Sequence, residues 1–161
     1  MKQTELFLYN KVVNIDKDIL QFKNREIKAK KIFTIIEIDK KIAYNFIKQY
    51  HYLKDAKFFA KYSYGLYIDN ILVGCSTFSN PQGISAMKSW FGLPNSDQSV
   101  LELSRLCMLP KLNGTNATSY LLGNSMKMLK SKEVKAVITL ADDSRHVGSI
   151  YQVCNFKYYG S

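Results

Sequence analysis

The sequence predicts a mixed α/β fold, in which helices cover one sheet of parallel and antiparallel strands. Three observations predict it. Short β-branched or alternating runs are interspersed with segments of helical apolar spacing. An Asp-Asn pair joins two of the runs as a hairpin, and a long helical segment separates two others as a crossover. The 161 residues, of which 47% are hydrophobic, suffice for one domain with a full core.

The first half of the chain predicts a strand, a helix and the hairpin. Residues 1–31 form a basic lead, in which residues 5–13 have a strand-like pattern. Residues 32–38 are a β-branched strand, and Asp39 stands where a helix N-cap belongs. The helix predicted over residues 40–53 has five apolar residues at helical spacing: Ile42, Ala43, Phe46, Ile47 and Tyr50. Residues 64–78 then read as strand, Asp69-Asn70 turn and strand.

The second half predicts a crossover and a short final helix. Residues 80–98 form a long polar loop, a kind of segment that is often functional. A strand over residues 99–109 stops at Pro110. Residues 116–131 form a helix, and residues 134–141 form a strand that we expect to be central because it has few polar breaks. Residues 148–156 form a short helix, and residues 157–161 begin one more strand. One face of the longer helix is made of Leu121, Leu122, Ser125 and Leu129.

The charge of the chain favours a polyanionic partner. Twenty-three basic and 13 acidic side chains leave a net charge of +10, which is typical of nucleic-acid-binding proteins. A lysine- and asparagine-rich chain from an AT-rich genome would show the same excess. No apolar run is long enough for a membrane span, and the first ten residues lack a signal-peptide core. The three cysteines, Cys75, Cys107 and Cys154, have no paired spacing, so we expect packing residues of a cytoplasmic chain.

Arg105 is the first candidate for chemistry. Strict alternation places it on the same strand face as Leu101, Leu103, Cys107 and Leu109. A guanidinium among apolar side chains needs a partner. That partner is either an acid, such as Asp142 or Glu102, or the phosphate or carboxylate of a ligand.

A glycine-containing turn, KLNGTNATS, opens the longer helix. Free N–H groups at such a helix start favour an anion, and Lys111 and Gly114 suit a phosphate. Ordinary capping by Asn113 or Thr115 explains the same residues.

The two histidines and the acids after the last apolar strand are further candidates. His51 ends the first helix in an aromatic cluster, where packing and catalysis are both open. Asp142 and Asp143 follow the strand over residues 134–141 and either hold a base or cap the next helix. Tyr151 in that helix either donates a proton or packs.

The residues of the last helix carry a resemblance. The segment GSIYQVCNFKYYG (148–160) resembles the fourth-helix signature of GNAT-type acyltransferases, with Asn155 in place of the usual glycine at the helix end. Four segments together, YHYLKDAK, LELSRLCML, NATSYLL and LADDSRHVGSIYQVCNFKYYG, resemble the Mom-type DNA modification proteins of phages. The resemblance runs in order from about residue 50 to residue 160.

The resemblance implies a GNAT-like fold and an enzyme that adds a glycinamide (carbamoylmethyl) group to adenine in duplex DNA, so that restriction nucleases are blocked. It implies an active-site set of His51, Tyr52, Arg105, Ser119, Asp142 and Tyr151. A complete member continues past the position of Ser161, so we expect the sheet to lack its last strand or to be completed by another chain. An enzyme that extrudes a base also needs stacking platforms, for which the candidates are Tyr50, Tyr52, Tyr62, Tyr64 and Trp90.

The acyl donor and the reaction class stay open. The loop KLNGTNA has one glycine where acetyltransferases have R/Q-x-x-G-x-G/A, so the donor is acetyl-CoA or an activated glycine such as glycyl-tRNA. An N-acetyltransferase acting on a protein or small amine is the second hypothesis, and a non-catalytic DNA-binding, anti-restriction protein is the third. In the leading hypothesis Asp142 is base or orienter, His51 relays a proton, Tyr151 protonates the leaving group and Arg105 holds a phosphate or Asp142.

Overall fold

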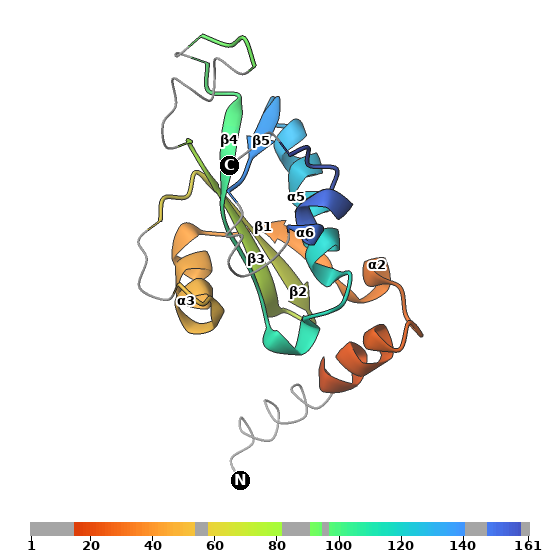
Figure 1. Ribbon diagram of the computed structural model, residues 1–161. Coiled ribbons are helices and arrows are strands. Elements are labelled where there is room, and N and C mark those ends of the chain that lie inside the picture. The colour runs from red at the N-terminus through yellow and green to blue at the C-terminus, as the bar shows by residue number, and fades with distance from the viewer. Residues whose placement is uncertain (1–14, 54–57, 82–90, 95–96, 141–147, 159–161) are drawn as a thin grey trace.

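Five strands form one mixed sheet in the computed structural model, which describes residues 15–53, 58–81, 91–94, 97–140 and 148–158 (Figure 1). Their order is β1-β2-β3-β4-β5, which follows the order of the chain. Neighbouring strands are antiparallel except for β4 and β5, which are parallel. The mixed α/β class is therefore confirmed. The bounds are β1 Thr34–Glu37, β2 Tyr62–Ile68, β3 Ile71–Ser79, β4 Val100–Met108 and β5 Ala136–Ile138.

The hairpin of β2 and β3 turns at the predicted Asp-Asn pair. Asp69 and Asn70 both have a positive φ, of 46° and 66°. A two-residue turn with this backbone matches the twist of the strands that it joins. The turn pairs Ile68 with Ile71, and a bulge at Val73 then shifts the register so that Tyr64 faces Ser76 and Gly65 faces Cys75.

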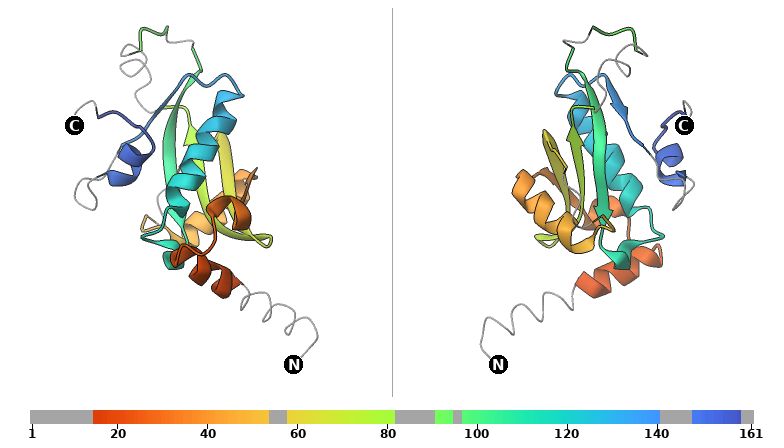
Figure 2. Two further views of the ribbon diagram at one scale, coloured as in Figure 1. Left: turned by 90° about the vertical axis from the view of Figure 1, so that its right-hand side faces the viewer. Right: turned by 60° about the vertical axis from the view of Figure 1, so that its left-hand side comes forward.

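Helix α3 (Lys40–Tyr50) covers one face of the sheet (Figure 2). The carboxylate of Asp39 accepts a hydrogen bond of 2.7 Å from the Lys41 N–H, so the predicted N-cap is confirmed. The helix buries Ala43, Phe46 and Ile47 against Cys75 and Cys107 of the sheet. Two residues of the predicted apolar stripe, Ile42 and Tyr50, instead stay 46% and 37% exposed.

Helix α5 (Ala117–Lys130) covers the opposite face (Figure 2). The four residues predicted for its inner side are all buried. Ser125 is the polar member of that stripe, and its hydroxyl lies 2.8 Å from the hydroxyl of Ser76 in β3. The same hydroxyl donates to the carbonyl of Leu121, so the buried polar group is satisfied.

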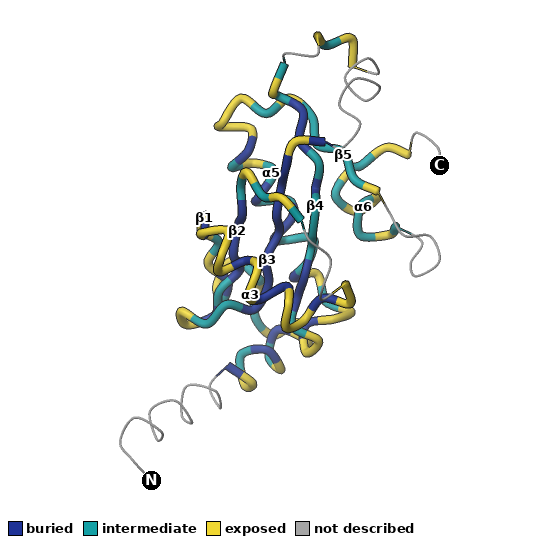
Figure 3. The backbone as a smooth tube through the Cα atoms, turned by 90° about the vertical axis from the view of Figure 1, so that its left-hand side faces the viewer, coloured by how far each residue is buried: buried dark blue, intermediate teal, exposed yellow. Residues whose placement is uncertain are grey.

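The basic lead is in part a folded element. Residues 15–23 are helical, and α2 (Ala29–Ile32) follows before β1. Ile15, Ile19 and Phe22 are buried in the same core cluster as Phe33 and Leu121, and buried positions continue from the sheet into this segment (Figure 3). The predicted strand over 32–38 therefore begins two residues later, because Ile32 ends α2. The strand-like pattern over residues 5–13 lies outside the described residues.

Strand β5 lies at the edge of the described sheet, so the expectation of a central position was wrong. It pairs with β4 alone, and its three residues are only partly buried. The predicted short helix is α6 (Ser149–Val153), which packs beside α5. Asn155 ends this helix with φ of 63°, the left-handed conformation that its side chain tolerates. Residues 157–158 are not in a strand, and residues 159–161 lie outside the described residues.

Two cysteines belong to the core. Cys75 and Cys107 face each other across β3 and β4 and are buried, whereas Cys154 is half-buried. All three are free thiols. Burial raises the pKa of the Cys107 thiol to about 12 and that of Cys75 above the range of ordinary thiols. Neither buried thiol is a nucleophile near neutral pH. Across the part of the chain that is described, helices are too short or too polar to cross a membrane.

Candidate active site

A β-bulge in β4 decides which face of the sheet carries Arg105. Thr77 of β3 faces Arg105, but the next residue, Phe78, faces Leu103, so Ser104 is the extra residue of the bulge. Leu103 packs against α5, as does Leu101. Arg105 and Cys107 instead point to the α3 face. The sequence-based prediction that Arg105 shares a face with Leu101 and Leu103 was therefore wrong, because strict alternation breaks at Ser104.

The guanidinium of Arg105 is held by the backbone and by an aromatic ring. Its Nη1 donates a hydrogen bond of 2.6 Å to the carbonyl oxygen of Ser104. Its Cζ lies 5.6 Å from the ring centroid of Phe58, a cation–π distance. Its Nε is buried and has no hydrogen-bond partner among the described residues. The candidate partner Asp142 lies outside the described residues.

Two hydroxyls lie beside Arg105 in one row across the sheet. Ser63 faces Thr77, and Thr77 faces Arg105, so the three residues occupy successive strands on the α3 face. The side-chain oxygens of Ser63 and Thr77 are buried and, within the described ranges, also lack a hydrogen-bond partner. We call Ser63, Thr77 and Arg105 the polar row. A row of unsatisfied buried groups costs stability, and such groups concentrate at functional sites. Sequence reasoning missed Ser63 and Thr77, because a plain hairpin would pair Ser63 with Ser76 and only the bulge in β3 shifts it to Thr77.

His51 lies at the C-terminal end of α3 and is a neutral imidazole. Its Nδ1 accepts a hydrogen bond of 3.1 Å from the N–H of Leu53. Since that donor is a backbone amide, Nδ1 has no proton and Nε2 must have one. Burial, and to a lesser extent the charge of Arg105, lowers the pKa of His51 from 6.5 to about 4. Near neutral pH the ring therefore donates a hydrogen bond from Nε2.

Tyr52 and Tyr151 approach each other from opposite faces of the sheet. The ring of Tyr52 stacks on His51 at a centroid distance of 4.4 Å and is 47% exposed. Tyr151 of α6 packs with the α5-side core and edge-on to Phe156. Burial raises the pKa of Tyr151; a side-chain hydrogen bond from Thr139 opposes this, and the nearby Tyr52 adds to it. Thr139 is thus a further candidate that sequence reasoning missed.

The pairing of β4 and β5 ends near Thr139 and Arg105. The two strands pair over three residues only, ending at Glu102 and Ile138, whereas β4 continues to Met108. Thr139 directly follows the last paired residue of β5, and Arg105 lies three residues beyond the last paired residue of β4. The two strands therefore lie in one sheet, and their pairing ends where β4 continues alone. We call His51, Tyr52, Arg105, Thr139 and Tyr151 the strand-gap site.

In this structure the residues of the predicted phosphate loop make contacts within the protein. The ammonium of Lys111 lies 2.7 Å from the carboxylate of Asp16 in the N-terminal helical segment. The hydroxyl of Thr115 accepts from the Ala117 N–H, so it takes part in capping α5 as one of the sequence alternatives held. Gly114 has φ of +75°, and a Cβ there would meet no atom within 4 Å. The positive φ explains the glycine of this turn, and the space beside it is open.

Two other predicted binding residues make contacts within the protein. The hydroxyl of Ser119 donates to the Asn116 carbonyl, and its own carbonyl accepts from the Cys154 thiol at 3.8 Å, which joins α5 to α6. Tyr64 is fully buried and lies edge-on to Phe78 in the α5-side core. The binding role predicted for Tyr64 does not fit this position, because no face of its ring is open to a ligand.

Several predicted residues lie outside the described residues: Trp90, Asp142, Asp143 and His146. The stacking candidates Tyr50 and Tyr62 are described. Tyr50 packs on Phe46 at 4.8 Å, and the Lys132 ammonium lies 4.8 Å from the ring centroid of Tyr62. Both rings therefore already have partners. Where side chains are described, no three of His, Cys, Asp or Glu gather as metal ligands.

Comparison with known proteins decides the family. The model of the Mom protein family matches residues 32–161, which include every described residue of the strand-gap site. The chain belongs to the Mom protein family. This Mom-family chain has no match among curated protein sequences. The resemblance seen in four sequence segments is thereby confirmed.

Solved structures show that the Mom-family chain has the GNAT fold. An aminoglycoside N-acetyltransferase AAC(6')-Iy bound to CoA matches with a TM-score of 0.55, 12% identity and coverage of 80% of this chain and 90% of that one. A GNAT-family acetyltransferase from Brucella melitensis bound to acetyl-CoA matches with a TM-score of 0.56, 16% identity and coverage of 79% and 84%. An aminoglycoside acetyltransferase from an uncultured soil metagenomic sample, in complex with sisomicin, matches with a TM-score of 0.57, 9% identity and coverage of 83% and 99%. The predicted GNAT-like fold is confirmed.

Proposed function

We propose that this protein is a transferase that modifies adenine in duplex DNA with a carbamoylmethyl group and so protects the DNA from restriction. The observation that carries the proposal is the match to the Mom protein family over residues 32–161. The net charge of +10 supports a nucleic-acid substrate, and the GNAT fold supports transfer of an acyl group to an amine. A phage protein of this kind would act in the host cytoplasm.

Tyr151 is the proposed general acid. Its raised pKa keeps the phenol protonated at neutral pH, and the hydrogen bond from Thr139 leaves its own O–H available to a leaving group. It lies at the point where β4 and β5 part, near Tyr52 from the other face. The exposed ring of Tyr52 supports a second role as a stacking surface for an extruded adenine.

His51 is the proposed hydrogen-bond donor to the substrate and not the proton relay that the sequence suggested. Its Nδ1 is already occupied by the Leu53 amide. A pKa of about 4 also makes it too weak a base to take a proton near neutral pH. A neutral Nε2–H can steady a developing oxyanion, and the positive charge of Arg105 supports the same role. Asp142 is still the candidate base, and this assignment rests on the sequence alone.

An activated glycine fits the product better than acetyl-CoA. The adenine amine would attack the glycyl carbonyl, and the C–O bond to the donor would break as the donor hydroxyl receives a proton. The free glycyl amine would then attack the ring carbon through a five-membered intermediate. The bond from that carbon to the original nitrogen would break, and this nitrogen would end as the terminal amide. Glycyl-tRNA supplies such a glycine, and a basic protein suits two nucleic acids.

Mass spectrometry of nucleosides tests the proposed function. DNA from cells that express the protein should contain carbamoylmethyl-adenine, and DNA from cells that express Tyr151→Phe should contain little. Growth with ¹⁵N-glycine should place the label on the ring-attached nitrogen. Unmodified adenine in all samples would refute the proposed function, whereas a label on the amide nitrogen alone would refute only the route.

The GNAT fold supports a second candidate function, an N-acetyltransferase that acts on a protein or small amine. The neighbours bound to CoA or acetyl-CoA favour it. The loop over residues 111–115 argues against it, because its lysine is paired with Asp16 and because it has one glycine where acetyltransferases have R/Q-x-x-G-x-G/A. Calorimetric titration with coenzyme A separates this candidate from a non-catalytic DNA-binding, anti-restriction protein.

A further inference from the structure

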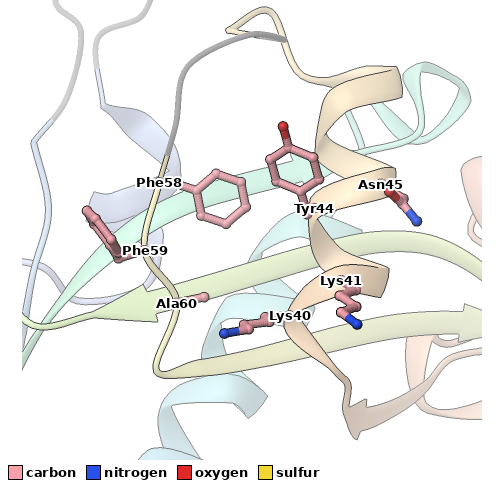
Figure 4. Close-up of a pocket in the computed structure, with 7 residues that line it drawn as sticks. All are labelled: Lys40, Lys41, Tyr44, Asn45, Phe58, Phe59 and Ala60. Carbon is pink, nitrogen blue, oxygen red and sulfur yellow. The ribbon is translucent and has the colours of Figure 1, made fainter.

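A hollow of about 460 Å³ lies between the first two turns of α3 and the segment that leads into β2. Its walls combine three aromatic rings with two lysines (Figure 4). The rings of Tyr44 and Phe58 lie side by side, Phe59 stands on the other side of the segment, and Lys40 and Lys41 project from the helix start. We call this hollow the lysine–aromatic pocket.

The aromatic rings of this pocket are only partly buried. Tyr44 and Phe58 stack at a centroid distance of 5.9 Å with 26° between their planes. Phe59 is 78% exposed, and Tyr44 is 43% exposed. A phenylalanine ring that stands in water contributes almost nothing to the fold. Flat, open rings of this kind are typical surfaces for stacking a planar ligand.

The lysines of the pocket give it a positive charge. Lys40 and Lys41 are both exposed. The acid beside them, Asp39, already accepts the hydrogen bond that caps α3. Among the described residues that line the pocket, none is acidic. A ligand that carries both a planar ring and a phosphate matches this lining, and a nucleotide is such a ligand.

Phe58 joins this pocket to the strand-gap site. One face of its ring stacks on Tyr44, and the guanidinium of Arg105 lies 5.6 Å from its centroid. Arg105 in turn acts on His51, which stacks on Tyr52. The pocket is thus separated from the predicted adenine site by a single row of side chains.

We propose that the lysine–aromatic pocket holds a nucleotide that neighbours the target adenine on the same DNA strand. The base stacks on the exposed ring of Phe59, and its phosphate pairs with Lys40 and Lys41. The partner rests on the proposed function, since DNA is taken as the substrate. The pocket reads no base identity, because rings and lysines contact any nucleotide equally.

Binding of fluorescein-labelled dT12 tests the pocket independently of adenine modification, because this strand contains no adenine. Fluorescence anisotropy should show that Phe59→Ala weakens binding about tenfold, as expected for the loss of one stacked base. The pair Lys40→Gln and Lys41→Gln should weaken it similarly and flatten its salt dependence. Lys17→Gln with Lys23→Gln removes the same charge from the exposed side of the N-terminal helical segment and should change binding less than about threefold.

Three results would overturn the pocket. The first is unchanged dT12 binding by Phe59→Ala, and the second is an equal loss in the control lysine pair. The third is a Phe59-dependent affinity for free AMP or coenzyme A that dT12 does not share, since the pocket then serves a free nucleotide. Adenine modification is measured in parallel. Normal modification with unchanged binding in Phe59→Ala refutes the pocket alone, whereas pocket-dependent binding without modification refutes the proposed function alone.

Discussion

The positive charge of Arg105 acts on the imidazole of His51, although the two residues come from different elements. Burial is the larger cause of the low pKa of His51, and the charge of Arg105 is the second. Both residues lie on the α3 side of the sheet, one in β4 and one at the end of α3. The pair is therefore coupled, and a change in one residue is measurable at the other.

Removing the charge of Arg105 should raise the pKa of His51. In Arg105→Met the aliphatic stem still packs against Phe58, so the fold should persist. The His51 pKa should move from about 4 toward 6.5, and ¹⁵N NMR titration of the imidazole measures it. Arg25→Met, a change at an exposed arginine, is the control and should leave the value unchanged. The coupling is wrong if both variants titrate like the wild type.

Stability should fall with acid because of His51. Its folded-state pKa of about 4 lies below the unfolded value of 6.5, so the unfolded chain binds a proton that the folded protein does not. The contribution is fully present above pH 6.5 and is lost as pH falls toward 4. We expect a loss of about 1–2 kcal/mol in the free energy of unfolding, because solvent screens part of the effect.

Urea denaturation between pH 7 and pH 4 measures this loss. His51→Gln cannot titrate, so its stability should vary less with pH over the same window. An equal slope in wild type and His51→Gln would assign the acid sensitivity to other groups.

The two neighbours Ser76 and Thr77 should respond in opposite ways. Thr77→Val removes a buried hydroxyl without a described partner, so the free energy of unfolding should rise by about 1 kcal/mol. Ser76→Ala breaks the buried contact with Ser125, so it should cost about 1 kcal/mol. Urea denaturation compares the two variants. If the polar row serves the site, Thr77→Val should also lose modification, and Ser76→Ala should keep it.

Tyr151→Phe should preserve the fold and lower modification about 10²–10⁴-fold, the usual contribution of a general acid. The ring keeps its contact with Phe156, and only the hydroxyl is lost. Nucleoside mass spectrometry measures the product. Tyr158→Phe, at a residue that is 84% exposed, is the matched control. Near-normal product from a folded Tyr151→Phe would leave this tyrosine a packing role.

Binding to duplex DNA should weaken steeply with salt. A net charge of +10 displaces condensed counterions from the phosphates. Even four phosphate contacts predict a loss of roughly a hundredfold between about 50 and 200 mM salt. Electrophoretic mobility or anisotropy over this range measures it, and an affinity that does not change would exclude binding through the charged surface.

The sequence predicted local elements well, because each depends on a short pattern. The Asp39 cap, the Asp69-Asn70 turn and the inner stripe of α5 all follow from neighbouring residues. The edge position of β5 did not follow, because an apolar run has the same composition at an edge and in the centre of a sheet. Packing of the N-terminal segment also depends on long-range contacts that no local pattern records.

The candidate site followed from the sequence in part. Arg105, His51 and Tyr151 were candidates from their places in the predicted elements, and Tyr52 was added by the resemblance. Ser63, Thr77 and Thr139 were missed, because a lone hydroxyl in a strand has no recognisable spacing. The tautomer of His51 could not be predicted from the sequence either, since it is set by a hydrogen bond from the Leu53 amide.

The bulge at Ser104 leaves one residue of β4 out of the ladder, and the position of Arg105 depends on this. If Ser104 paired as a regular strand residue, the guanidinium of Arg105 would turn into the apolar layer beneath α5, where Leu101 and Leu103 now pack. A buried charge without a partner costs several kcal/mol. A chain without residue 104 would instead have Arg105 directly after Leu103, and so on the face where it lies now. Related sequences should therefore either keep a bulge between Leu103 and Arg105 or have one residue fewer between them.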